Sequence, residues 1–507
     1  MDKKFPDFKD LENKLNEFFT REFSEHHTQP NKFGEKEDTT TNQPRTSKMD
    51  FDIKPMELEE YLNRYVVDQE DAVEVLATKI CTHFNRMKIE EDNNLPKIVG
   101  NVKSNILMIG PTGVGKTYLV KLIAQRIGVP FVKGDATKFS ETGYVGGDVE
   151  DMIRELVHEA NGDISWAEYG IVYLDEIDKI AGGSDSRGIG GPDVSRRGVQ
   201  RNLLKLMEES EVDMKVPHDL ASQMEAVMQA QRTGKVDRKK VNTKNILFIM
   251  SGAFAGLDEI ISKRLNQQAI GFVEENKDTK NIKDKLFHYI KTEDLIKYGF
   301  ESEFVGRLPV LTVLDELDVN GLYKILLNKR SSVIQGRIRD FQAYGIKLKF
   351  TKEALWRVAE LAYEEKTGAR GLTGVLERAL VKFEKVLPST HIKKLTVTKE
   401  LIDKPNELLH IIVHQDSIEK FVYEFMKKHG VEIKFDKDAF ETLISRSKKE
   451  NKTVDEILET DFQNYEYGLK LIGIQRFNIT KEVISDPKTY LDDLIKESYS
   501  KNRKTYG

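Results

Sequence analysis

Residues Gly110 to Thr117 read Gly-Pro-Thr-Gly-Val-Gly-Lys-Thr, and this stretch decides the fold of the chain. It follows a short apolar run, Ile106 to Ile109, and precedes an amphipathic stretch, Tyr118 to Ile127. A glycine-rich turn between a buried strand and a helix lets backbone N–H groups surround a phosphate, while the positive end of the helix faces the same anion. The stretch therefore predicts a phosphate-binding loop in an α/β domain with a parallel sheet.

The loop also predicts which cofactors bind. Lys116 is expected to bridge the β- and γ-phosphates of ATP, and Thr117 is expected to ligate Mg²⁺. We expect nine consecutive residues to form this part of the nucleotide site: Gly110, Pro111, Thr112, Gly113, Val114, Gly115, Lys116, Thr117 and Tyr118.

A pair of carboxylates follows a second apolar run, Ile171 to Leu174. Asp175 and Glu176 then lie at the carboxyl edge of the predicted sheet, where ligands of such sheets bind. Asp175 is expected to hold Mg²⁺ through water, and Glu176 to polarise the attacking water. Together with the loop, this pair indicates ATP hydrolysis rather than nucleotide binding alone.

The apolar pattern divides the chain into five segments. Phe131–Val132 and Ile246–Met250 are two further short apolar runs, separated from the others by helical stretches, which indicates a parallel sheet. From Val319 to about Lys385 the apolar spacing is mainly helical. The predicted segments are a short amphipathic helix (1–25), a flexible linker (26–50), a large α/β domain (51–317), a smaller, mainly helical α+β domain (318–399) and a C-terminal extension (400–507).

Composition excludes several classes of protein. The chain has 507 residues, too many for one hydrophobic core, and a formal net charge of -5, which gives no general attraction to nucleic acid or anionic lipid. Cys81 is its single cysteine, so neither an intrachain disulfide nor a multi-cysteine zinc module can form. Because no signal peptide and no long apolar run are present, we expect a cytoplasmic protein without a membrane segment.

One internal repeat lies in the second half of the chain. The run Tyr344 to Leu355 parallels His429 to Phe440, each with a glycine, an alternating strand pattern and a helix start. The extension is therefore either a degenerate copy of the smaller domain or a generic strand, cap and helix that arose twice. The extension has Lys452 to Asp455 where the smaller domain has Thr367 to Arg370, so a copy would lack the arginine at the position of Arg370.

From about Pro55 to about Thr398, the chain resembles the ClpX family of AAA+ unfoldases. The resemblance rests on motifs in order: Asp175 to Ile180, then Asp193 to Gln200, then Leu203 to Glu208. It implies an AAA+ P-loop ATPase that forms a homo-oligomeric ring, expected to be a hexamer. It also implies protein substrates and a ClpP-like peptidase as partner.

The resemblance assigns further residues of the ATPase site. Val66 and Val67 would hold the adenine, although the family usually has glycine where Asp68 stands. Ser251 matches the first sensor, which responds to the γ-phosphate or its attacking water. Arg307 resembles the arginine finger offered to a neighbouring subunit, and Arg370 resembles the second sensor.

Three segments are expected to contact substrate or partner. Tyr144 and Val145, between glycines, resemble the pore loop that grips polypeptide. Ile270, Gly271 and Phe272 stand in the position of the loop that docks on the peptidase. A second pore loop is expected between Glu208 and Asn245, in a basic stretch.

Other functions remain open on the sequence. The leading hypothesis is an unfoldase that feeds a peptidase; the alternatives are a stand-alone remodelling chaperone and, against the acidic balance, a nucleic-acid motor. The four-cysteine zinc domain that usually begins the family's chains is missing here, so the means of substrate selection is not indicated.

Overall fold

The computed structural model describes residues 51–92, 103–140, 147–182, 194–214, 239–269 and 286–505. The predicted N-terminal helix and linker, residues 1–25 and 26–50, lie outside the described residues. No helix in the described part of the chain combines the length and the apolar character needed to cross a membrane.

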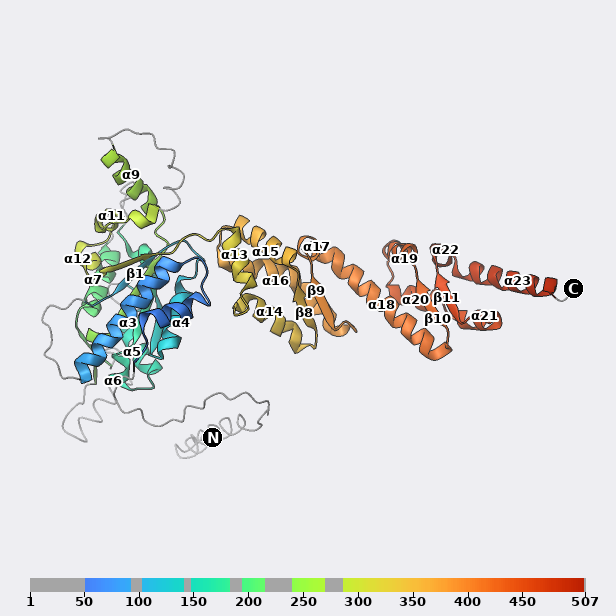
Figure 1. Ribbon diagram of the computed structural model, residues 1–507, viewed down its shortest axis with the longest axis horizontal. Helices are drawn as coiled ribbons and strands as arrows, with labels where there is room; N and C mark the ends of the chain where they lie inside the picture. Colours follow the sequence, from blue (N-terminus) through green and yellow to red (C-terminus); the bar gives the residue numbers. More distant parts are fainter. Residues whose placement is uncertain are drawn as a thin grey trace, which may run out of the picture. The chain divides into compact units, whose positions relative to one another are not determined.

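The centre of the large domain, around the strand labelled β1 in Figure 1, is a five-stranded parallel sheet with the order β2-β3-β6-β1-β7. Its strands are β1 (Ile106–Ile109), β2 (Phe131–Asp135), β3 (Ile171–Asp175), β6 (Leu247–Gly252) and β7 (Val310–Val313). The first four match the predicted apolar runs to within a few residues at each end. The fifth, β7, was not predicted as a strand; it pairs with β1.

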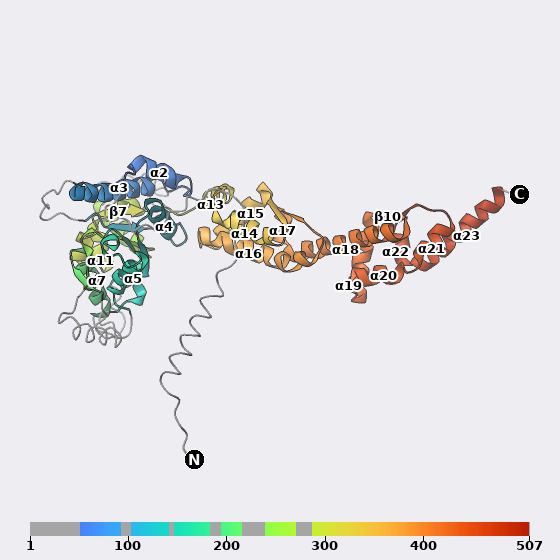
Figure 2. The same cartoon turned by 90° about the horizontal axis from the view of Figure 1, so that it is seen from below.

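Helices cover both faces of this sheet. Alternate residues of each strand point to opposite faces, so Met108 and Tyr173 belong to one apolar core while Leu107 and Leu174 belong to the other. Figure 2 shows α2, α3 and α4 on one side and α5 and α7 on the other. The helical elements are α2 (Pro55–Asn63), α3 (Glu70–Asp92), α4 (Lys116–Ile127), η1 (Ala136–Lys138), α5 (Asp151–Glu159), α6 (Ile164–Ala167), η2 (Ile177–Ile180), α7 (Val194–Met207), η3 (Thr243–Asn245), α9 (Leu257–Ala269), η4 (Leu286–Tyr289), α11 (Thr292–Tyr298) and α12 (Ser302–Gly306).

An antiparallel hairpin, β4 (Glu211–Asp213) and β5 (Lys240–Asn242), is added to the large domain. Its two strands bracket residues 215–238, which lie outside the described part of the chain. The predicted second pore loop is within that bracket.

The smaller domain combines helices with one short parallel pair of strands, β8 with β9. Its elements are α13 (Val319–Leu327), α14 (Ser332–Ala343), β8 (Lys347–Phe350), α15 (Lys352–Glu364), α16 (Ala369–Val386), η5 (Leu387–Ser389), β9 (Lys394–Val397) and α17 (Lys399–Asp403). Thr351 caps α15 because its side chain accepts a hydrogen bond from the Ala354 N–H. The apolar core of this domain is continuous with the core on the α3 and α4 side of the sheet.

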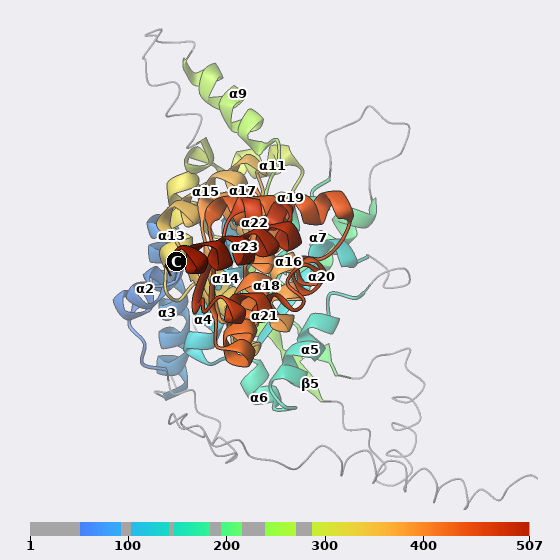
Figure 3. The ribbon, with the colours of Figure 1, turned by 90° about the vertical axis from the view of Figure 1, so that its right-hand side faces the viewer.

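The C-terminal extension has a core of its own. Its elements are α18 (Pro405–His429), β10 (Glu432–Phe435), α19 (Lys437–Glu450), α20 (Val454–Asp461), α21 (Tyr465–Leu471), β11 (Arg476–Ile479), α22 (Lys481–Ser485) and α23 (Pro487–Thr505). The long helix α18 serves both cores: Leu409 packs into the core of the smaller domain, whereas Ile418 and Phe425 pack into that of the extension. The helices α19, α22 and α23 gather around the extension core (Figure 3).

The extension follows nearly the same order of elements as the smaller domain, with α20 and α21 where the smaller domain has α16 and η5. In both, a helix ends at a glycine with positive φ (Gly345, 71°; Gly430, 73°) and leads into a short strand, a capping residue and a helix. That helix ends near a residue with a φ of 52° in each case, Lys366 and Asn451. Further along, a second strand parallel to the first (β9 or β11) is followed by a short helix (α17 or α22). A proline, Pro405 or Pro487, then begins the next helix.

Candidate active site

A cavity of about 430 Å³ lies where the carboxyl ends of β1, β3 and β6 meet the smaller domain. The large domain contributes the glycine-rich loop and the two carboxylates after β3, and the smaller domain contributes the start of α16 and the turn before α14. The lining residues are Tyr65, Val66, Val67, Thr112, Gly113, Val114, Gly115, Lys116, Thr117, Tyr118, Asp175, Glu176, Asp178, Lys179, Gly252, Ala253, Leu317, Ile325, Ser331, Ser332, Val333, Ala369, Arg370 and Thr373.

The loop touches the smaller domain through its backbone. The Ala369 N–H donates to the Gly113 carbonyl over 2.9 Å. Gly113 has a φ of 83°, and a Cβ there would lie 2.0 Å from the Thr367 carbonyl oxygen. Only glycine allows both the left-handed backbone and this approach, so the residue that shapes the phosphate loop also seats the second domain against it.

Lys116 is held at the centre of the loop. Its Nζ donates to the carbonyl oxygens of Gly110, at 2.5 Å, and Pro111, at 2.8 Å. Burial lowers the pKa of Lys116, while the carboxylates of Asp175 and Asp178 oppose that shift. Gly110 and Pro111 were predicted to contact nucleotide; they do not line the cavity, and their carbonyls hold the lysine instead.

Asp175 collects hydrogen bonds from two hydroxyls. Thr117 Oγ1 donates to Asp175 Oδ2 over 3.0 Å, and Ser251 Oγ donates to Asp175 Oδ1 over 2.8 Å. Lys133 Nζ lies 3.3 Å from the same Oδ2. Burial tends to raise the pKa of Asp175, but the two hydroxyls and Lys133 outweigh it and hold that pKa below its ordinary value.

Ser251 was predicted to sense the γ-phosphate or its attacking water. Its side chain is fully buried and bonded to Asp175, and the next two residues, Gly252 and Ala253, line the cavity. Tyr173, which the sequence analysis did not select, shares this cluster. Its hydroxyl lies 2.6 Å from Ser251 Oγ and 3.1 Å from Thr117 Oγ1. The only sequence signal was a phenol in an otherwise aliphatic strand.

Glu176 follows with an unusual backbone. Its φ of 58° is in the left-handed region, which costs a non-glycine residue about 1–3 kcal/mol. The side chain is exposed and lines both the nucleotide cavity and a neighbouring cavity of about 850 Å³. The Glu176 side chain does not cap the following helical turn. Its carboxylate is therefore free to face the two cavities that it lines.

Tyr65, Val66 and Val67 line the cavity; Val66 and Val67 are the residues predicted to hold adenine. Asp68, where the family usually has glycine, keeps the left-handed backbone with a φ of 53°. Its carboxylate accepts a hydrogen bond from Lys324 Nζ over 2.7 Å, which ties the turn to α13 of the smaller domain. The turn is therefore preserved despite the substitution, since aspartate tolerates this conformation better than most residues.

The two predicted arginines lie in different places. Arg370, the second residue of α16, lines the cavity. Arg307 does not line it; its guanidinium pairs with Glu208 Oε1 at 2.5 Å, and its carbonyl accepts from the buried Asn105 side chain. The side chain of Arg307 is thus directed away from the nucleotide cavity of its own chain.

Tyr144, Val145, Ile270, Gly271 and Phe272 lie outside the described residues. The segments around them are nevertheless anchored. Gly147 exchanges backbone hydrogen bonds with Lys138 and Ser140, which brings together the ends of the segment that contains Tyr144. A buried bidentate pair, Arg264 with Asp294, links α9 to α11 on either side of the segment that contains Phe272.

The donor set suits a nucleotide with a hard divalent cation. One carboxylate and one hydroxyl, Asp175 and Thr117, adjoin a lysine that is bonded only to backbone carbonyls. Among the residues that the structure describes, no cluster of three or more His, Cys, Asp or Glu side chains could hold a metal by itself. A cation here would need phosphate oxygens as further ligands, which is how Mg²⁺ is commonly bound with nucleotides.

Comparison with known proteins agrees with this geometry. The family profile "AAA domain (Cdc48 subfamily)" matches residues 101–311, and "C-terminal, D2-small domain, of ClpB protein" matches residues 323–384. The ATP-dependent Clp protease ATP-binding subunits ClpX of Borrelia duttonii (strain Ly) and Borrelia recurrentis (strain A1) are each 42% identical over 355 residues, covering 69% of this chain and 79% of theirs. The corresponding subunit of Treponema denticola is 38% identical over 351 residues, covering 69% and 81%. With a nucleotide cavity of the expected composition on an AAA+ fold, the chain is an ATPase and belongs to the ClpX family.

Proposed function

We propose that the chain forms a homo-hexameric ring that hydrolyses ATP with Mg²⁺, unfolds protein substrates by threading them through its pore, and delivers them to a ClpP-like peptidase. The observation that carries this proposal is that residues of both the large and the smaller domain line the cavity. Its phosphate loop is bonded to the smaller domain through Ala369 and Gly113, so a nucleotide there contacts both domains. Hydrolysis then changes the relative free energies of the two domain positions, which is the requirement for mechanical work.

Each residue has a proposed task in hydrolysis. Lys116 and the backbone of the loop hold the phosphates, while Thr117 and Asp175 hold Mg²⁺, which would offset phosphate charge. Glu176 polarises the attacking water, a role supported by its exposed carboxylate beside Asp175. Arg370, in the smaller domain, contacts the phosphates of the bound nucleotide and so makes the position of that domain depend on the nucleotide.

Arg307 would act on the nucleotide of a neighbouring subunit. In support, its side chain is not in the wall of its own cavity, and within the described part of the chain it forms a half-exposed ion pair with Glu208. Such surface pairs are worth about 0–1 kcal/mol, so exchanging Glu208 for a phosphate costs little. Ser251 would act through Asp175, to which it is bonded, rather than by direct contact with phosphate.

Substrate and partner contacts are proposed from the segments beyond the described residues. Tyr144 and Val145 would grip polypeptide in the pore, and Ile270, Gly271 and Phe272 would dock on the peptidase. The C-terminal extension would be a second copy of the smaller domain that does not bind nucleotide. This is supported by the shared order of elements and by Asp455, which stands where the first copy has Arg370.

Three variants separate the three steps of this function. Glu176→Gln should keep ATP binding and lose hydrolysis by about 100-fold or more; full turnover would contradict the hydrolytic role. Tyr144→Ala should retain ATPase activity and fail to unfold a tagged model protein. Phe272→Ala should retain both ATPase and unfolding activity and lose only ATP-dependent degradation with the cognate peptidase ring. If degradation survives Phe272→Ala, the proposed docking contact is wrong.

A further inference from the structure

A buried phenol lies at the centre of the cation-binding cluster. Tyr173, in β3, is fully buried, and its ring is fixed by stacking on Phe131, with centroids 6.5 Å apart. Lys133 Nζ lies 5.9 Å from the centroid of the same ring. The Tyr173 hydroxyl is thereby set between Ser251 Oγ, at 2.6 Å, and Thr117 Oγ1, at 3.1 Å.

Counting protons shows what each hydroxyl can do. Thr117, Ser251 and Tyr173 each carry one O–H and can accept as well. Thr117 and Ser251 both donate to Asp175, one to each carboxylate oxygen. The phenol proton then goes to Ser251, the closer oxygen, because the Ser251 proton is already on the carboxylate. The Tyr173 oxygen remains available as an acceptor on the side of Thr117.

This free acceptor matters when Thr117 binds a cation. A hydroxyl that offers its oxygen to a metal must direct its proton to another acceptor. Asp175 Oδ2 is the present acceptor, but it is shared with Lys133 and is itself a proposed partner of the hydrated cation. In the described structure, the other oxygen at hydrogen-bonding distance from Thr117 Oγ1 is the Tyr173 phenol.

We propose that Tyr173 is a positioning residue for the magnesium site: its phenol oxygen accepts a hydrogen bond from the Thr117 hydroxyl when the Thr117 oxygen binds the cation, and its own O–H, donated to Ser251, holds Ser251 against Asp175. The inference rests on the proposed use of Mg²⁺. A phenylalanine would fill this apolar strand without burying a hydroxyl, whose burial is unfavourable unless it is hydrogen-bonded.

The test is Tyr173→Phe in the full chain, with Mn²⁺ as a spectroscopic substitute for Mg²⁺. Binding of Mn²⁺ in the presence of ADP is followed by electron paramagnetic resonance, and ADP affinity without metal is measured separately. We expect the half-saturating Mn²⁺ concentration to rise about 5- to 10-fold, the loss typical of one hydrogen bond. Metal-free ADP affinity should change less than about twofold, because the phenol does not line the cavity.

A matched control exists in the extension. Tyr465 is also buried, and its hydroxyl has no hydrogen-bond partner among the described residues. Tyr465→Phe removes the same atom from a distant core and should leave Mn²⁺ binding unchanged. If it weakens Mn²⁺ binding as much as Tyr173→Phe does, the effect is general and the proposal is overturned.

A double-mutant cycle tests whether Tyr173 acts through Thr117. In a Thr117→Ala background, Tyr173→Phe should weaken Mn²⁺ binding less than it does in the parent, because only the contact with Ser251 is then lost; an undiminished effect would refute the proposed route through Thr117. If the parent protein binds Mn²⁺ with ADP and Tyr173→Phe binds it equally well, this inference alone fails. If the parent binds no Mn²⁺ with ADP, the proposed use of magnesium fails with it.

Discussion

The smaller domain and the C-terminal extension have a similar order of strands and helices, although the extension has α20 and α21 where the smaller domain has α16 and η5. Of the two, only the smaller domain contributes described residues to the cavity at the phosphate loop. In the smaller domain, the turn before α16 lies against the phosphate loop, where Gly368 and Gly113 approach backbone to backbone. In the extension, the corresponding turn is closed on itself: Thr453 and Glu456 form a capping box at the start of α20. The residues of this turn therefore decide whether it packs against the phosphate loop, as before α16, or is capped by its own side chains, as before α20.

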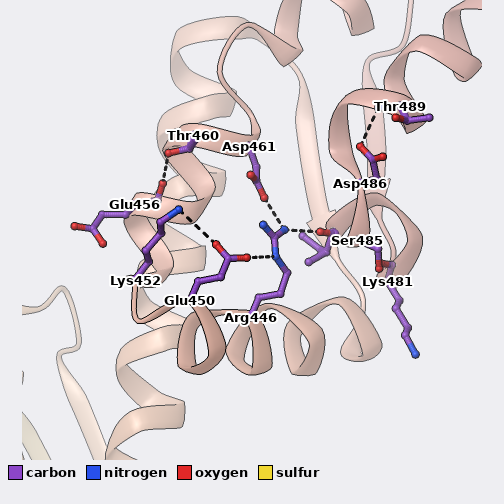
Figure 4. A network of polar contacts seen from close by, with 11 residues as sticks. Arg446, Glu450, Lys452, Glu456, Thr460, Asp461, Lys481, Ser485, Asp486 and Thr489 are labelled. Carbon is purple, nitrogen blue, oxygen red and sulfur yellow. Dashed lines mark hydrogen bonds and ion pairs between the residues drawn. The ribbon is translucent and has the colours of Figure 1, made fainter.

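The two regions also differ in how they fill the space behind the first helix. In the smaller domain, a groove of about 330 Å³ with an apolar floor remains open beside Leu361. In the extension, Arg446 has the position in α19 that Leu361 has in α15. Its guanidinium bonds to Asp461, Glu450 and the Ile484 carbonyl (Figure 4).

This difference suggests what each region is built for. The extension closes the turn before α20 with its own side chains and pairs Arg446 within its own fold, as expected of a unit that has to be stable without a nucleotide. The smaller domain leaves its turn glycines and Arg370 directed at another domain, as expected of a unit whose position responds to a ligand.

The largest expected contrast is between Arg370 and Asp455, the second residues of α16 and α20. Arg370→Ala should lower kcat for ATP hydrolysis by about 100-fold, because a cation directed at developing phosphate charge is lost. Asp455→Ala should leave kcat within about twofold, since that residue bonds only Ser417 in the extension. Steady-state ATPase assays check both, with circular dichroism as a control for folding. A large loss of turnover in Asp455→Ala would mean that the extension takes part in the ATPase cycle.

Acid should destabilise the large domain more than the extension. Burial lowers the pKa of His83 to about 4, although the Asn245 carbonyl that it contacts works in the other direction. Between pH 6.5 and 4 the unfolded chain binds a proton that the folded chain excludes, so the unfolding free energy falls as pH decreases through this window. The loss is at most about 3 kcal/mol, and it is absent above pH 6.5.

The measurement is denaturant unfolding at pH 7 and pH 4.5, followed by a probe in the large domain, for the parent and for His83→Gln. The variant should show a smaller decrease between the two pH values. Burial also lowers the pKa of His414 in α18, but that side chain is only half-buried and its contribution should be smaller. Equal acid sensitivity of the parent and His83→Gln would contradict this explanation.

The smallest contrast is between Arg357, which links α15 to α17 in the smaller domain, and Arg446, which links α19 to α22 in the extension. Arg446→Ala should destabilise the extension by about 2 kcal/mol, because it leaves Asp461 and the Ile484 carbonyl without their shared partner in a partly buried site. Arg357→Ala breaks more exposed pairs with Asp403 and Glu360 in the smaller domain and should cost about 1 kcal/mol or less. Hydrogen exchange of the α19–α22 and α15–α17 amides compares them locally. Equal protection losses would show that the Arg446 contacts add no more stability than the exposed pairs of Arg357.

Much of the ATPase site could be predicted from sequence because its signals are local. A strand, a glycine-rich turn and a helix are adjacent in the chain, so β1 matched the predicted bounds and α4 began within two residues of the expected start. Asp175 and Glu176 were found for the same reason, as the end of an apolar run. The parallel runs at Gly345 and Gly430 indicated a second strand, cap and helix, and the structure has one at each.

Interactions between residues far apart in the chain were not accessible in this way. Strand β7 was missed because its short apolar run follows a proline and becomes a strand only by pairing with β1. Ser251 and Tyr173 lie on neighbouring strands, and only the register of β3 with β6 brings their hydroxyls together. Asp68, at a position where the family usually has glycine, gave no sequence signal of its partner, because Lys324 is distant in the chain and reaches Asp68 only through the packing of α13.

The sequence by itself thus determined a glycine-rich loop of the phosphate-binding type at Gly110 to Thr117, next to a parallel sheet, since that pattern is written in consecutive residues. Only the tertiary structure decided which hydroxyls surround Asp175, that Arg307 points away from its own cavity, and that Gly113 joins two domains. The physical reason is that hydrogen bonds and ion pairs depend on distances of a few ångströms between atoms, and the packing of distant segments sets those distances.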